Sequence, residues 1–130
     1  MLPSRLKRTE LTATRASLVA LQGGRCAVCE RKFSTKVVAC VDHDHKLGHI
    51  RGALCRACNR LEGQLGNRVV MAGGTGMETQ MLRNLADYWD KYSKGHPTMG
   101  VVWHPDHKTE NEKRLERNRK AREKRAKLKG

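Results

Sequence analysis

The chain has 130 residues, a formal net charge of +14 and only 4% aromatic residues. Such a chain allows one small domain with an extension, and its core is too small to be stable without a metal, disulfides or a partner subunit. No run of 18 apolar residues occurs, which excludes a transmembrane helix.

The first half of the chain combines a helix with short strands. Residues 1–8 read as a flexible basic arm, and Thr9 is expected to cap a helix that runs to about Gln22 and ends at Gly23-Gly24. A β-type apolar run covers residues 37–41, and residues 49–54 are expected to form its return strand, with the turn between them at residues 46–48.

The second half is expected to be mostly helical. A short helix is predicted from about Ala57 to Leu65, stopped by Gly66. Residues 77–92 give the clearest helical pattern, with one apolar face made of Met77, Met81, Leu85, Tyr88, Trp89 and Tyr92. The sequence therefore predicts an α+β, mostly helical protein with four segments: 1–24 (basic arm and helix), 25–66 (core), 67–107 (helical region) and 108–130 (basic tail).

Half of the excess positive charge lies in the C-terminal tail. From Lys108 to Lys129 there are 11 basic and 4 acidic residues, a composition that favours a solvated helix or a segment that orders on a partner. Lys and Arg that neutralise phosphates give strong, salt-sensitive binding, so a polyanion is the expected partner. A tail that only aids solubility is the alternative. A membrane surface is disfavoured because the tail has no apolar face with Trp or Phe.

Four of the five cysteines form two Cys-x-x-Cys pairs. The N-terminus has no apolar signal-peptide region, so we expect a reducing cytoplasm, in which such pairs bind metal rather than form disulfides. Two pairs separated by 25 residues indicate a closed, structural zinc site. A pair of redox motifs or buried free thiols is the alternative, and an iron–sulfur cluster is a minor one. The predicted ligands are Cys26, Cys29, Cys55 and Cys58, and Cys40 is left over as a small buried residue.

A run of alternating aspartates and histidines, residues 42–45, lies between the two cysteine pairs. If this run is extended, Asp42 and Asp44 face one side and the histidines the other; a turn would break that alternation. Mg²⁺ prefers a few oxygen ligands, and Asp42 with the amide oxygen of Asn59 fits that preference. A nearby neutral imidazole can accept a proton from water. A polar surface turn without catalytic function is the alternative.

The segment from Arg25 to Leu65 closely resembles the phage recombination endonuclease VII family of His-Me finger (HNH-like) nucleases. The resemblance is carried by the two cysteine pairs and by the runs 41–45, 48–59 and 62–64. It implies that residues 25–66 are a zinc-bound ββα-metal nuclease core, that residues 67–107 are a helical dimerisation region, and that an intertwined homodimer cleaves branched DNA. Asp42 and Asn59 would bind Mg²⁺ or Mn²⁺, and His43 would be the general base. His45 and Glu62 match auxiliary positions near the metal.

Basic residues around the matched segment are candidates for DNA contacts, namely Arg51, Arg56 and Arg60; for Arg51 an ordinary strand-end arginine is an equally good interpretation. One departure from the family is Cys40, which stands where a relative has a histidine. Two other functions remain open at this point. One is a nicking HNH endonuclease of phage packaging or homing, and the other is a zinc module that binds nucleic acid without cutting it.

Overall fold

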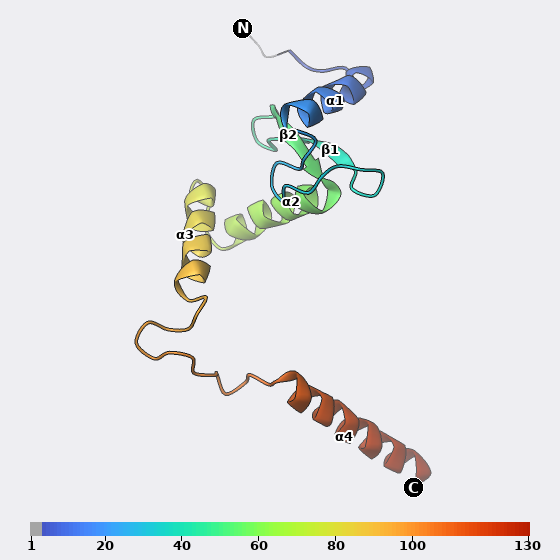
Figure 1. Cartoon of the computed structure of the whole chain (residues 1–130), viewed down its shortest axis with the longest axis vertical. Helices are drawn as coiled ribbons and strands as arrows, with labels where there is room; N and C mark the ends of the chain where they lie inside the picture. Colours follow the sequence, from blue (N-terminus) through green and yellow to red (C-terminus); the bar gives the residue numbers. More distant parts are fainter. Residues whose placement is uncertain (1–3) are drawn as a thin grey trace. The chain divides into compact units, whose positions relative to one another are not determined.

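The computed structural model describes residues 4–130, and these form an α+β protein (Figure 1). The chain divides into two compact units, one ending at Arg83 and the other starting at Asn84. The described elements are a 3-10 turn (Arg8–Glu10), α1 (Leu11–Leu21), β1 (Ala39–His43), β2 (Ile50–Cys55), α2 (Arg56–Met71), α3 (Glu78–Lys91) and α4 (Glu110–Lys129). The unit boundary falls inside α3, so the first unit contains the hairpin together with α1 and α2.

The strands β1 and β2 form the expected antiparallel hairpin, which confirms the prediction from the two apolar runs. The first strand ends at His43, and the chain then turns: the Asp44 carboxylate accepts hydrogen bonds from the backbone N–H groups of Lys46 (2.8 Å) and Leu47 (2.7 Å). An aspartate that bonds to the backbone two residues on is a common turn-forming device. The strict strand alternation considered for residues 42–45 is therefore broken after His43.

The core of the first unit is small and rich in cysteine. Its buried hydrophobic residues, among those described, are Cys26, Ala53, Leu54, Cys55, Cys58 and Val69. Phe33 and Val37 pack against this group while remaining partly exposed. Half of these core residues are cysteines, so apolar burial supplies little stability to this unit.

The side chain of Gln22, directly after α1, links this helix to the hairpin by hydrogen bonds. Its amide nitrogen donates to the carbonyl oxygens of Arg25 (2.9 Å) and Ala53 (2.9 Å), and its amide oxygen accepts from the N–H of Ala53 (2.8 Å). The start of the helix differs from expectation. Thr9 lies inside the 3-10 turn, and Glu10 instead accepts a hydrogen bond from the backbone N–H of Lys7 (2.6 Å).

The helix α2 is longer than predicted, since it continues through Gly66 to Met71. A helical glycine costs only about 1 kcal/mol relative to alanine, and burial of an apolar side chain further along can offset that cost. Val69 is that side chain, with 8% exposure. The chain leaves the helix at Gly73, whose φ of +83° suits glycine.

The two C-terminal helices agree with the sequence prediction. The helix α3 leaves large apolar side chains exposed, including Tyr88 (60%) and Trp89 (66%). The helix α4 begins with a capping box in which Thr109 accepts from the N–H of Glu112 and Glu112 accepts from the N–H of Thr109. Among the helices of residues 4–130, none is both long and apolar enough to cross a bilayer.

Candidate active site and metal centre

The four predicted zinc ligands come together at one point. The sulfur atoms of Cys26, Cys29, Cys55 and Cys58 all lie within 4.8 Å of one another, and three of the four residues are buried. Four sulfurs this close can surround a single metal ion such as zinc with no position left for water. Cys40 stands outside the group, in β1 opposite Leu54.

The second cysteine pair also starts α2. The Cys55 sulfur accepts a hydrogen bond from the backbone N–H of Cys58 (3.4 Å) and so caps the helix. This places Asn59 in the first turn of the helix, immediately after a ligand of the cysteine cluster. The position of Asn59 is therefore fixed by the same turn that supplies two sulfurs.

An arginine that the sequence analysis did not single out contacts this cluster. The Arg31 guanidinium donates to the sulfur of Cys29 (3.2 Å) and to that of Cys55 (3.5 Å). This contact lowers the pKa of the Cys29 thiol to about 6, whereas burial raises the pKa of Cys58 to about 12. Because metals bind the thiolate form, Arg31 favours the protonation state in which the cluster can hold a cation.

A cleft of about 340 Å³ brings together the residues that the sequence associates with hydrolysis. Asp42 and His43 reach it from the end of β1, and Asn59 and Arg60 reach it from the first turns of α2. Asp42 is buried (5% exposed), whereas the imidazole of His43 is accessible. The cleft thus combines a fixed carboxylate, an amide and an exposed imidazole.

Three carboxylates surround the guanidinium of Arg51. Its Nε and one terminal nitrogen donate to the two oxygens of Asp42 at 2.7 and 3.0 Å. The same terminal nitrogen lies 2.9 Å from Glu62, and the other one lies 3.9 Å from Asp44. The second oxygen of Glu62, Oε2, is buried and has no hydrogen-bond partner among the described residues.

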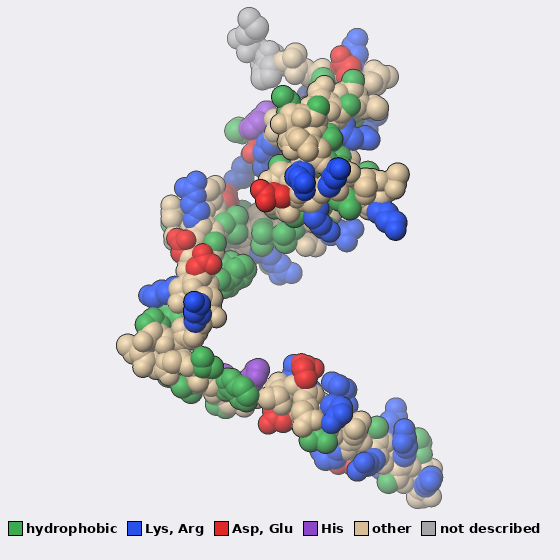
Figure 2. Space-filling model, in the orientation of Figure 1, with side chains coloured by type: hydrophobic (Ala, Val, Ile, Leu, Met, Phe, Trp, Pro, Cys, Tyr) green, Lys and Arg blue, Asp and Glu red, His purple; other side chains and the backbone are tan. Residues whose placement is uncertain are grey.

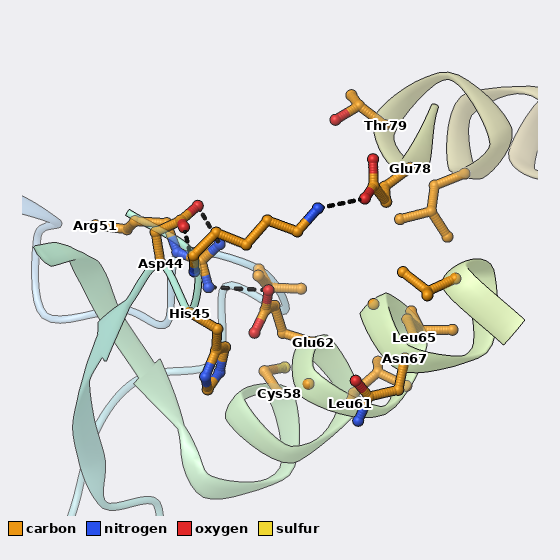
Figure 3. A pocket seen from close by; sticks show the side chains of 16 residues that line it. Asp44, His45, Arg51, Cys58, Leu61, Glu62, Leu65, Asn67, Glu78 and Thr79 are labelled. Atoms are coloured by element: carbon orange, nitrogen blue, oxygen red, sulfur yellow. Dashed lines mark hydrogen bonds and ion pairs between the residues drawn. The ribbon is translucent and has the colours of Figure 1, made fainter. Parts of the chain in front are cut away.

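A second and larger hollow, of about 680 Å³, lies beside this cleft. Arg51, Asp44 and Glu62 line it, and Figure 3 shows Arg51 and Glu62 pointing toward one another there. At its far side, the ion pair between Lys46 and Glu78 (2.7 Å) connects the turn of the hairpin to the start of α3. His45 lines both hollows, and its ring lies 5.0 Å from that of His43.

Of the predicted site residues, five line the cleft: Asp42, His43, His45, Asn59 and Arg60. Arg51 and Glu62 line the adjoining hollow instead. Arg56 is exposed at the start of α2 and lines neither hollow among the described residues. Gln22, Arg31 and the Lys46–Glu78 pair lay outside the candidates of the sequence analysis. The spacing of residues along the sequence does not predict such contacts. Their partners are either distant in the sequence or are cysteine sulfurs whose orientation is known only from the fold.

Comparison with known proteins agrees with this geometry. Residues 4–91 match the sequence profile of recombination endonuclease VII, which covers more than half of the chain. The chain belongs to the recombination endonuclease VII family. Both the cysteine cluster and the cleft of the first unit lie inside the matched region.

Two phage proteins match a short stretch of the chain. The gene 59 protein of Mycobacterium phage L5 is 54% identical over 39 residues, which are 30% of this chain and 24% of the phage protein. The gene 59 protein of Mycobacterium phage D29 is 46% identical over 44 residues, 34% of this chain and 27% of the phage protein. The chain therefore spans about a quarter of the length of these curated relatives.

Proposed function

We propose that the chain is a metal-dependent DNA endonuclease of the His-Me finger type that cleaves phosphodiesters in branched DNA. The observation that carries the proposal is the cleft lined by Asp42, His43 and Asn59, within a region that matches recombination endonuclease VII. A protein that only binds DNA has no use for a carboxylate, an amide and an exposed imidazole in one cleft. We expect a phage-encoded protein that acts in the cytoplasm of the host cell.

The donors in the cleft fit a hydrated divalent cation. Asp42 supplies a carboxylate and Asn59 an amide oxygen, a set that suits Mg²⁺ or Mn²⁺ with waters completing the coordination. Glu62 lies on the same helix as Asn59 but lines the adjoining hollow, where one of its oxygens is paired with Arg51 and the other, Oε2, is buried without a partner within residues 4–130. The cysteine cluster would hold a structural Zn²⁺.

Each residue of the cleft is proposed to have a separate role in hydrolysis. When bound, the divalent ion supplies a Lewis acid that stabilises negative charge on the phosphate and on the leaving oxygen. His43, in its neutral form, accepts the proton of the attacking water, and its exposure gives solvent access to it. His45 lies beside it as an auxiliary group. We propose that Arg60, which lines the cleft, and Arg56, four residues earlier in α2, contact phosphate.

Cleavage of a four-way junction with Mg²⁺ or Mn²⁺ tests the proposal. His43→Ala should lower the cleavage rate by about 10²–10⁴-fold, the usual contribution of general-base catalysis. His49→Ala is the matched control, because His49 is exposed and lines neither hollow in the described part of the chain. A His43→Ala variant that cleaves at the wild-type rate would refute the mechanism.

Two further results separate the alternatives. An Asp42→Asn variant that binds junction DNA as tightly as wild type but does not cut it excludes a purely binding function. Equal rates on a junction and on a linear duplex of the same sequence favour a general nicking enzyme. Tight binding without cleavage by the wild-type protein, with either metal, would instead make the chain a non-catalytic zinc module.

The exposed apolar side chains of α3 support a homodimer. Tyr88 and Trp89 are 60% and 66% exposed, and Leu85 is 40% exposed on the same helix. A second copy would cover these side chains and place two active sites on one junction. Sedimentation equilibrium should give a dimer for the wild type and a monomer for Trp89→Lys. An unchanged mass would contradict this use of α3.

The basic helix α4 is proposed to add sequence-independent affinity for DNA. Figure 2 shows Lys and Arg side chains along it, and five of them recur at intervals of four and three residues on one face: Lys113, Arg117, Lys120, Lys124 and Lys127. Deletion of residues 108–130 should weaken DNA binding and reduce the slope of log K against log salt, by up to about 4–5 if all five contact phosphates. An unchanged slope would leave the tail with a role in solubility only.

A further inference from the structure

The guanidinium of Arg51 is the centre of the charged cluster beside the cleft. It makes a two-pronged contact with Asp42, at 2.7 and 3.0 Å, and a single contact with Glu62 at 2.9 Å. The Arg51 side chain is about one-third exposed (33%), and that of Asp42 only 7%. Two parallel hydrogen bonds between an arginine fork and a carboxylate fix the carboxylate in orientation as well as in position.

An irregularity in the hairpin places Arg51 there. Asp42 is opposite Gly52, but the next residue, His43, is opposite Ile50, so Arg51 is an extra residue in β2. A bulge of this kind changes the direction of a side chain relative to the regular strand and often lies next to an active site. The hairpin therefore departs from regular pairing at Arg51, the residue that contacts both oxygens of Asp42.

Arg51 approaches Asp42 from outside the cleft. Asp42 lines the 340 Å³ cleft, in which Arg51 takes no part, while Arg51 lines the adjoining 680 Å³ hollow, to which Asp42 does not contribute. Each carboxylate oxygen has two lone pairs, so one can accept from the guanidinium while the other remains available on the cleft side. The contact with Arg51 is thus compatible with a cation held by Asp42 in the cleft.

We propose that Arg51 is a positioning residue for the divalent-metal site, an inference that rests on the proposed function. It holds the Asp42 carboxylate in the orientation in which that group binds the cation, and it fixes Glu62 beside it. Groups that hydrogen-bond to a metal ligand commonly contribute 10–100-fold to metal affinity. A lysine cannot replace the arginine, because a single ammonium does not reproduce the fork that contacts both oxygens of Asp42.

Two other roles for Arg51 make different predictions. As a DNA contact, Arg51 would contribute to DNA affinity, would be replaceable by lysine in part, and would not affect metal binding in the absence of DNA. As a cation that competes with the metal for Asp42, Arg51 would weaken metal binding, and its removal would strengthen it. Metal affinity measured without DNA therefore separates the three roles.

The experiment measures Mn²⁺ binding to the zinc-loaded, full-length protein without DNA, by calorimetry or by electron paramagnetic resonance of free Mn²⁺. Arg51→Met and Arg51→Lys are compared with Arg68→Met. The control removes the same charge from an exposed position in α2 that forms no ion pair among the described residues. Zinc content and circular dichroism establish that each variant is folded.

We expect Mn²⁺ affinity to fall about 10–100-fold in both Arg51 variants and to be unchanged in Arg68→Met. Unchanged or tighter Mn²⁺ binding in folded Arg51→Met would overturn the inference, as would full affinity in Arg51→Lys. If Arg51→Met does not fold, the charge-preserving Arg51→Lys variant decides. A wild-type protein that binds no Mn²⁺ would refute the proposed metal site itself, and the inference with it.

Discussion

Replacement of Gln22 by alanine tests how the first unit is held together. This side chain makes three hydrogen bonds of 2.8–2.9 Å, which join the end of α1 to Arg25 and to Ala53. Ala53 is fully buried (0% exposed), so its N–H would lose its partner at a cost of about 1–3 kcal/mol. The Ala53 carbonyl keeps a second donor, the N–H of Ala27 at 3.2 Å. Together with the two lost bonds to carbonyls, at about 0.5–1 kcal/mol each, the variant should lose about 3 kcal/mol.

Urea unfolding of the zinc-loaded protein at fixed zinc concentration measures this loss. With a slope of about 2 kcal/mol per molar urea, the midpoint should fall by about 1.5 M. Gln22→Glu should be destabilised as well, because its carboxylate would face the two carbonyl oxygens that now accept from the amide. The control is Gln64→Ala, an exposed position expected to change stability by less than about 0.5 kcal/mol. A loss below that size for Gln22→Ala would refute the reasoning.

Three other predictions follow from the same contacts. Cys29→Ser should abolish stoichiometric zinc binding, measured by atomic absorption, whereas Cys40→Ser should leave it intact. Arg31→Met should speed zinc loss to a chelator, since two sulfurs lose a charged donor; an unchanged rate would refute that role. The hydrogen bond from Lys108 lowers the pKa of Glu116 to about 2. The stabilisation from this pair should therefore be complete above pH about 4.5 and be lost as the pH falls toward 2. An NMR titration of the Glu116 carboxyl carbon checks this, and Lys108→Met should raise the pKa of Glu116.

Sequence spacing was sufficient for the parts of the fold that rest on local chemistry. The two Cys-x-x-Cys pairs predicted the cluster, and the apolar runs predicted the hairpin, because each pattern has few structural solutions. The end of α2 was predicted wrongly, since Gly66 marks a stop only where no later burial, such as that of Val69, favours the helix.

The contacts that hold the cleft residues in place could not be predicted from sequence patterns. Arg51 is nine residues from Asp42, and whether they meet depends on the bulge in β2, which is set by the pairing register rather than by residue type. Gln22 is 31 residues from Ala53, and its role depends on the direction in which α1 ends. Such contacts arise from tertiary geometry, and a single sequence carries no periodic signal for them.

The cysteine cluster and the cleft both depend on the junction between β2 and α2 at Cys55. Cys55 ends β2 and caps α2, so the strand pair that carries Asp42 and the helix that carries Asn59 meet at a residue of the cluster. Removal of zinc should loosen this junction, move Asp42 and Asn59 apart and abolish Mn²⁺ binding. This effect is expected even though none of the described cysteines lines the cleft. Mn²⁺ titration of zinc-stripped and zinc-restored protein measures the effect. Wild-type Mn²⁺ affinity in the zinc-stripped protein would show that the cleft forms without the cluster.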